Sequence, residues 1–228
     1  MILDAFKFTN NLFSNHFSKF LSVVFPVYVI IFFVYLQMSS IPGNEFGTTT
    51  AFNYQELVTN LLSVYAVILS ILLIDDISNG RKRSIINYLF LGAYLYFKIL
   101  VINLITALAI VLGLVLLILP GLYISARLLF ASYLAIIFDK GIINSLKKSI
   151  EITQGKGWRV LGCLLAVIIS FLFIMILVLA GPAAFLIEEN INVYMAIVFS
   201  FSFLFTTYIT IYSYRLLTNL METSDESI

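Results

Sequence analysis

The feature that most constrains this chain is a series of six apolar stretches, each of about 17 to 22 residues. A helix rises 1.5 Å per residue, so about 20 residues cross the roughly 30 Å hydrocarbon core of a membrane. Backbone groups cannot stay unpaired in lipid, and each stretch is therefore expected to be helical. The predicted spans are residues 20–38, 57–74, 99–119, 122–138, 160–180 and 193–214.

The composition favours the same fold class. Hydrophobic residues make up 61% of the chain and charged residues 11%, with a mean hydropathy of +1.06. Soluble domains average about 45–50% apolar and about 25% charged residues. This chain has too few polar side chains to cover a soluble globule of its length. The sequence predicts an all-α, polytopic membrane protein with six transmembrane helices in a single membrane domain, residues 1–228.

Positive charges lie on one side of the predicted membrane. The loops that would face the other side, including Pro120–Gly121, contain no lysine or arginine. Lysine and arginine collect in the cytoplasmic loops of membrane proteins, so we expect both termini in the cytoplasm. The one-sided set comprises twelve of the thirteen basic residues: Lys7, Lys19, Arg81, Lys82, Arg83, Lys98, Lys140, Lys147, Lys148, Lys156, Arg159 and Arg215.

Three shorter segments, residues 2–18, 84–97 and 141–156, are predicted to be amphipathic helices in the cytoplasmic interface. In the third, apolar residues such as Ile142 recur at helical spacing opposite bases such as Lys147. An interfacial segment, a span and a return span thus occur three times, which predicts a pseudo-threefold repeat of helical hairpins. The alternative is that any six-span protein with both ends on one side divides into three hairpins.

The run "ILPGLYISARLLFASYLAIIFDKG", residues 118–141, is predicted to contain one turn and one helix cap. Pro120–Gly121 is expected to form a two-residue external turn between antiparallel spans, because proline interrupts the helical ladder and glycine accepts unusual dihedrals. Asp139 is expected to cap a helix that starts near Gly141. The expected breaks and interfacial anchors beyond that helix are Gly155, Gly157, Trp158 and Arg159.

Residues 118–162, "ILPGLYISARLLFASYLAIIFDKGIINSLKKSIEITQGKGWRVLG", resemble a motif of the bacterial inner-membrane family typified by YciC. They also resemble the membrane domain attached to some glycerophosphodiester phosphodiesterases. The resemblance implies a multi-pass protein of the bacterial inner (plasma) membrane. The first family is uncharacterised, and the phosphodiesterases keep catalysis in a separate soluble domain, so no substrate or catalytic residue is implied. The matching positions are Pro120, Gly121, Asp139, Lys140, Gly141, Ser145, Leu146, Ser149, Thr153 and Arg159.

Arg127 is the one charged residue inside the predicted span 122–138. It lies six residues past Gly121, about 9 Å below the expected external turn at 1.5 Å per residue. Such a guanidinium can snorkel to the headgroups or pair inside the bundle. Alternatively it grips a lipid phosphate or an anionic substrate from the external leaflet, or takes part in gating or transport. The sequence leaves these alternatives open.

Two basic clusters on the cytoplasmic side are candidate sites for anionic lipid, at about 1 kcal/mol per charge near the surface. The alternative is that they only set the topology. Asp75 and Asp76 end the second span beside the first cluster. We expect them to form a solvated boundary pair with nearby bases, and a proton or cation site is the alternative. The clusters are Arg81–Lys82–Arg83 and Lys147–Lys148.

The sequence predicts a protein that is not an enzyme, with no catalytic residue, cofactor or metal site. His16 is the only histidine, and no Walker-type loop, G-x-S-x-G or H-E-x-x-H motif is present. The leading expectation is a lipid-interacting or envelope-associated scaffold. Its expected partners are membrane lipids, with another membrane or envelope protein as a further candidate and no nucleic acid. One alternative is a small transporter or channel that uses Arg127 in a polar path. A second is a membrane anchor for a soluble partner.

Overall fold

The computed structural model describes residues 2–39, 54–180 and 191–222, and within these ranges the chain is helical and contains no strand. The predicted loops after the first and fifth spans, and the carboxyl-terminal tail, lie largely outside the described residues. The helices are α1 (Ile2–Val23), α2 (Phe25–Ser39), α3 (Tyr54–Ser78), α4 (Ile85–Leu116), α5 (Ile118–Leu128), α6 (Ala131–Ile137), α7 (Ile142–Ile152), α8 (Gly157–Ala180) and α10 (Ile191–Glu222).

The predicted fold class is confirmed. In the described part of the chain, five helical segments are long and apolar enough to cross a membrane, and there are six if the bent pair α1–α2 counts as one span. Segment 118–137, which joins α5 and α6, is one of them. The protein is therefore an all-α polytopic membrane protein.

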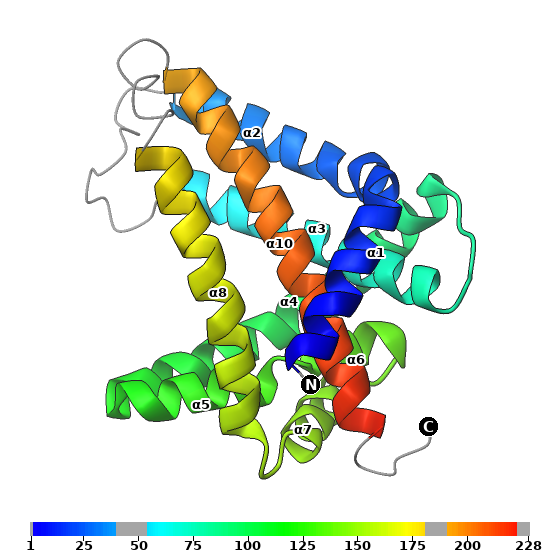
Figure 1. Ribbon diagram of the computed structural model, residues 1–228, viewed down its shortest axis with the longest axis vertical. Helices are drawn as coiled ribbons and strands as arrows, with labels where there is room; N and C mark the ends of the chain where they lie inside the picture. Colours follow the sequence, from blue (N-terminus) through cyan, green and yellow to red (C-terminus); the bar gives the residue numbers. More distant parts are fainter. Residues whose placement is uncertain (1, 40–53, 181–190, 223–228) are drawn as a thin grey trace.

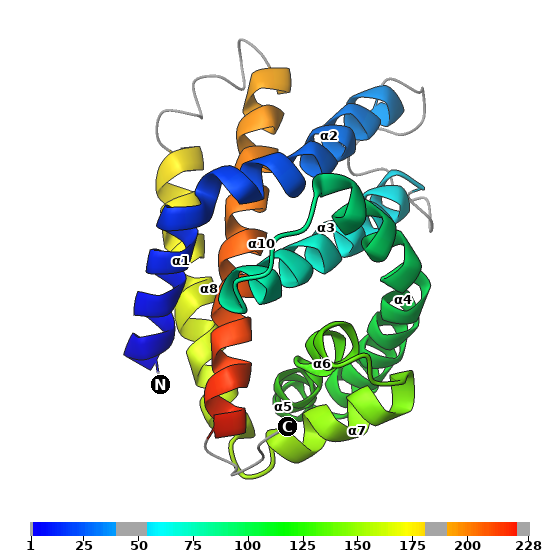
Figure 2. The same cartoon turned by 90° about the vertical axis from the view of Figure 1, so that its right-hand side faces the viewer.

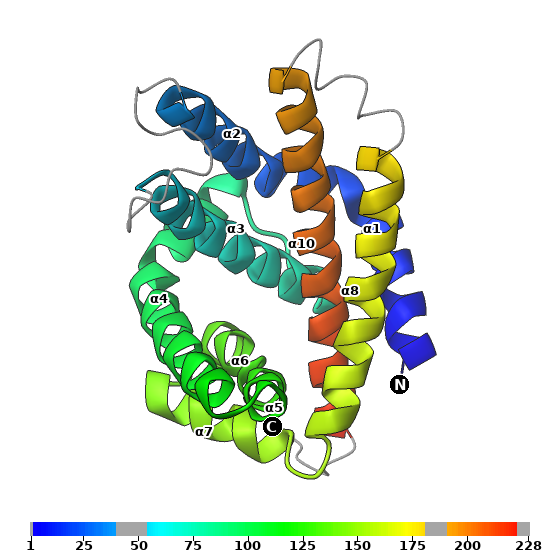
Figure 3. The ribbon, with the colours of Figure 1, turned by 90° about the vertical axis from the view of Figure 1, so that its left-hand side faces the viewer.

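The helices do not form a parallel bundle. Figure 1 shows α8 and α10 side by side along the long axis, with α4 and α5 running across their lower part. In the turned views, α5 and α6 are seen nearly end-on, while α8 and α10 still run vertically (Figures 2 and 3). The start of α1 lies against the end of α10, where Arg215 Nε donates to Asp4 Oδ2 at 3.0 Å. The two ends of the described chain therefore lie on the same side of the molecule.

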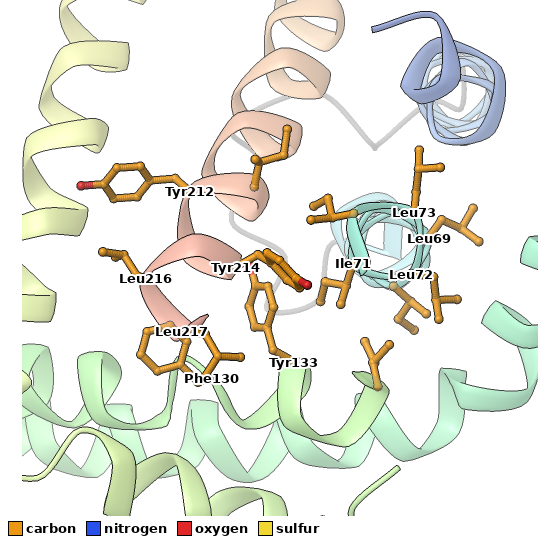
Figure 4. Close-up of a cluster of buried hydrophobic side chains, with 14 of the residues drawn as sticks. Leu69, Ile71, Leu72, Leu73, Phe130, Tyr133, Tyr212, Tyr214, Leu216 and Leu217 are labelled. Carbon is orange, nitrogen blue, oxygen red and sulfur yellow. The ribbon is translucent and has the colours of Figure 1, made fainter. Parts of the chain in front are cut away.

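The core lies where α3, α6 and α10 meet (Figure 4). Tyr133 of α6 and Tyr214 of α10 lie between α10 and Ile71 of α3. The Tyr133 hydroxyl donates to the Thr210 carbonyl at 3.2 Å, which gives this buried hydroxyl a hydrogen-bond partner. In lipid, helix association depends on van der Waals contact and hydrogen bonds rather than on escape from water. Close packing of these side chains is therefore what holds the three helices together.

The predicted first span, residues 20–38, is not one straight helix. The chain bends by 51° between α1 and α2, at Val24. Pro26 lies two residues further on, in the first turn of α2, and proline can neither donate to the preceding turn nor fit its ring against it. The Val27 amide bonds instead to the Val24 carbonyl at 3.1 Å. The predicted interfacial helix 2–18 is the first part of α1, which is kinked at His16 (φ −123°, ψ 16°), near the predicted end of that helix, and then continues to Val23.

The predicted interfacial segment 84–97 and the predicted span 99–119 form one helix, α4, of 32 residues. At 1.5 Å per residue α4 is about 48 Å long, against a hydrocarbon core of about 30 Å. Its start is capped by Ser84, whose Oγ accepts from the Asn87 amide at 3.4 Å. The three units of the predicted pseudo-threefold repeat are therefore not alike, because the middle unit has no separate interfacial helix. α10 likewise continues eight residues beyond the predicted span 193–214.

The predicted external turn at Pro120–Gly121 is wrong by one helical turn. The break lies at Leu117 (φ −166°, ψ 151°), and Pro120 and Gly121 belong to the first turn of α5. Proline is compatible with a first helical turn, because its missing N–H would have no partner there. Gly121 serves close packing instead: a Cβ on Gly113 of α4 would lie 2.8 Å from the Gly121 Cα. Small residues let membrane helices approach closely, and α4 and α5 form such a hairpin.

The predicted cap at Asp139 is also wrong. The helix α7 begins at Ile142 with Gly141 at the N-cap and no side-chain cap bond. Asp139 has φ +45° and instead accepts from Lys98 Nζ of α4 at 2.8 Å, which ties α4 to the corner between α6 and α7. The predicted helix 141–156 is present as the shorter α7. Gly155 (φ +70°) follows it as predicted, in the left-handed conformation that favours glycine.

The α4–α5 hairpin provides a test of glycine packing. Gly113→Ala should lower the free energy of unfolding by about 1–3 kcal/mol, because the new methyl group would overlap the α5 backbone. Thermal unfolding in detergent measures the change. Gly162→Ala is the matched control, because a Cβ there meets nothing within 4 Å. Equal stability of the two variants would contradict the close packing.

The pair Lys98–Asp139 predicts a dependence of stability on pH. The hydrogen bond from Lys98 and its charge lower the pKa of Asp139. The pair therefore stabilises the fold above the unfolded-state pKa of about 3.9, and this contribution is lost as pH falls through the lower folded-state value. The melting temperature of the protein should exceed that of Asp139→Asn at neutral pH, and the two should converge in acid. A difference independent of pH would contradict this assignment.

Candidate functional site: a basic groove

The strongest candidate site is a groove of about 400 Å³ where α1, α3 and α4 meet. Its walls are apolar, with Val23 from α1, Leu73 and Ile77 from α3, and Ile85 from α4. The hydroxyl groups of two α1 serines also line it. Its basic side chains are Lys19, Arg81, Lys82 and Arg83. The groove therefore combines apolar walls with four cations.

A helix-terminating turn places these cations. At the end of α3, the Gly80 amide bonds to the Ile77 carbonyl at 3.3 Å and the Arg81 amide to the Asp76 carbonyl at 2.8 Å. Gly80 has φ +66°, the left-handed conformation that this hydrogen-bond pattern requires of the residue that ends the helix. The turn folds Arg81 back over the last turn of α3. The sequence "SNG" at residues 78–80 is the local signal for it.

Two aspartates hold the arginines in place. Arg81 contacts Asp75, and its Nε lies 3.1 Å from Asp76 Oδ1. Arg83 Nε lies 3.1 Å from Asp76 Oδ2. The predicted pairing of Asp75 and Asp76 with nearby bases is present, but the carboxylates are buried rather than solvated: Asp76 is 1% exposed. The aspartates therefore fix the two guanidinium groups at the groove wall.

The groove keeps an excess of positive charge. Lys19 and Lys82 are exposed. Arg83 Nη1 is buried and has no hydrogen-bond partner among the described residues. Among the described residues, two carboxylates pair with the two arginines of the groove, and the charges of Lys19 and Lys82 are in excess. The start of α4 at the groove adds the partial positive charge of a helix N-terminus.

Sequence reasoning missed Lys19 as a member of this site. It identified Arg81, Lys82 and Arg83 from their adjacency, but Lys19 lies more than sixty residues away along the chain. The only signal was its position at the membrane end of an amphipathic segment, and many single bases share that feature. Only the packing of α1 beside the turn between α3 and α4 brings it to the groove.

Arg127 is half-buried and contacts α7 and its own helix rather than this groove. Its Nη2 donates to the Ile150 carbonyl of α7 at 2.6 Å, and its Nη1 to the Tyr123 hydroxyl at 3.4 Å. Its own carbonyl accepts from Ser149 Oγ at 2.7 Å. The guanidinium thus meets the carboxyl-terminal end of α7, where the helix dipole favours a cation. Of the predicted alternatives, this geometry agrees with pairing within the protein, although the partner is the short helix α7 rather than another predicted span.

The other predicted site residues lie apart from the groove. Lys147 is exposed on α7, and Lys148 Nζ lies 3.5 Å from Glu151. Arg159 lines a second cavity of about 440 Å³ beside the end of α10. Trp158 is largely exposed and lies against Tyr123, with ring centroids 5.2 Å apart. Gly157 approaches the Tyr123 ring so closely that a Cβ would lie 2.6 Å from it.

Comparisons of the chain with protein-family models, curated proteins and solved structures find no match. The resemblance to the YciC-type family therefore stays a prediction. Within the described ranges, no three His, Cys, Asp or Glu side chains gather in a way that could hold a metal ion.

The contacts of Arg127 predict a role in docking α7. Arg127→Met removes a charged donor from the Ile150 carbonyl, and we expect a loss of about 1–3 kcal/mol in stability with faster amide exchange across α7. Hydrogen–deuterium exchange of the protein in detergent measures this. The exposed Arg159, changed to Met, serves as the control. Unchanged exchange in α7 of Arg127→Met would show that the contact does not hold the helix.

Proposed function

We propose that this chain is a non-enzymatic, lipid-interacting protein of a bacterial inner membrane, with both termini in the cytoplasm. It would act as a scaffold or partner of envelope-lipid machinery and hold anionic phospholipid headgroups in the basic groove. The observation that carries the proposal is the groove itself, whose lining combines four cations with apolar side chains. This pairing of surfaces suits a molecule with an anionic head and an apolar tail.

Physical chemistry supports such binding. A basic residue near an anionic leaflet contributes about 1 kcal/mol of attraction. Arginine also offers paired N–H donors to phosphate oxygens, which adds geometric selectivity. Because Asp76 already orients Arg81 and Arg83, less side-chain entropy is lost when a phosphate binds. The fold therefore already supplies much of the side-chain ordering that phosphate binding requires.

The proposed orientation has separate support. Arg81 and its neighbours belong to the one-sided set of basic residues, which by the positive-inside rule faces the cytoplasm. The contact of Asp4 with Arg215 brings the two ends of the described chain together. The groove would then open at the cytoplasmic leaflet, where anionic lipids are accessible.

The transporter alternative has less support from the geometry. It depended on Arg127 as the charged element of a polar path. That guanidinium is instead joined to the Ile150 carbonyl and the Tyr123 hydroxyl, and its Nε is buried without a partner among the described residues. No specific contact favours the alternative of an anchor for a soluble partner.

Native mass spectrometry of the protein released from its own membrane tests the proposal. The protein should carry anionic phospholipid, and Lys19→Gln combined with Lys82→Gln should lose most of it, because the excess charge of the groove is removed. The control is Lys7→Gln combined with Lys140→Gln, since neither residue lines the groove. Arg127→Leu should also keep its lipid. Retention of lipid by the groove variant would overturn the proposal.

A further inference from the structure

We infer that the basic groove selects lipids whose head is a phosphomonoester, which carries up to two negative charges, over lipids with a singly charged phosphodiester head. This inference rests on the proposed function and names the class of lipid that the same site takes. It follows from the charge of the groove, from its donors and from the apolar surface beside it.

The net charge of the groove favours a head with two negative charges. Of the four cations that line the groove, the two arginines are paired with Asp75 and Asp76, and no further carboxylate among the described residues lines it. A phosphodiester neutralises one of the two excess charges and leaves the other. A phosphomonoester has its second pKa near 6, so its charge approaches −2 at neutral pH. Adjacent cations favour that doubly charged form further. The monoester is thus the head whose charge matches the groove.

The hydrogen-bond donors of the groove favour a head with three free oxygens. A phosphomonoester presents three free oxygens, whereas a phosphodiester presents two. The groove offers donors from two separate parts of the chain: Lys19 from α1, and Arg81, Lys82 and Arg83 from the turn between α3 and α4. Arg83 Nε lies 3.1 Å from Asp76 Oδ2, while 27% of the Arg83 side chain remains exposed. A third oxygen therefore gives these donors an additional acceptor.

An exposed apolar face of α4 offers a surface for the tail of the lipid. Exposed side chains continue from the groove along one face of α4, at helical spacings of four, four and three residues. They are Ile86 (62% exposed), Phe90 (74%), Tyr94 (79%) and Phe97 (75%). The face begins next to Ile85, which lines the groove. An acyl or isoprenyl chain whose phosphate sits in the groove can lie along it, so the ligand is a lipid monophosphate rather than free phosphate.

Competition in lipid nanodiscs tests the inference. The full chain is reconstituted with equal amounts of phosphatidic acid and phosphatidylglycerol that carry the same acyl chains, and native mass spectrometry reports the bound lipid. At pH 7.5 we expect about fivefold preference for phosphatidic acid, the effect of one extra paired charge near a membrane surface. At pH 5 the preference should fall, because the monoester loses its second charge. Excess glycerol phosphate should not displace the lipid.

The variants separate the possible failures. Lys19→Gln with Lys82→Gln should abolish the preference, while Lys7→Gln with Lys140→Gln should keep it, and matching melting temperatures show that all are folded. Equal binding of the two lipids at pH 7.5 would overturn this inference and leave the proposed function standing. Absence of both lipids would overturn the proposed function as well. Displacement by glycerol phosphate would identify a site for soluble phosphate and overturn the assignment to lipid.

Discussion

The arrangement at the junction of α3 and α4 depends on one buried carboxylate, that of Asp76. It lies beneath Arg81 and Arg83 and is almost fully inaccessible. The Arg81 and Arg83 side chains are 48% and 27% exposed, so solvent screens these ion pairs in part, but loss of either arginine would leave the buried carboxylate less compensated. The pair thus fixes the direction in which the chain leaves α3 and enters α4. The position of α4, the groove beside it and the packing of α1 against the turn all follow from that direction.

The sequence was sufficient for the fold class because hydrocarbon leaves few choices. An apolar stretch of about 20 residues must be helical, whatever its neighbours are. It was not sufficient for the ends of the helices. Proline at Pro120 was expected to mark a turn, yet proline suits a turn and a first helical turn equally well. Lys98 was expected to separate two segments, but a lysine does not interrupt a helix, so α4 continues through it.

Contacts between distant segments were the least predictable part of the site. Arg81, Lys82 and Arg83 could be identified because they are adjacent in the sequence. The places of Lys19 and of Arg127 depend on tertiary packing, since one meets the turn after α3 and the other meets α7. A lone arginine in an apolar run signals that a partner exists, but here that partner is a backbone carbonyl. Carbonyl groups have no signature in the sequence.

The length of α4 has a consequence for how the protein fits into a bilayer. α4 follows a path of about 48 Å and curves along it (Figures 2 and 3), and a helix longer than the bilayer core of about 30 Å is accommodated by tilting, by bending or by local thickening of the bilayer. Its first turn forms one wall of the groove, and its other end is packed against α5. A change in the tilt or curvature of α4 with bilayer thickness would therefore move that wall of the groove relative to α1 and α3.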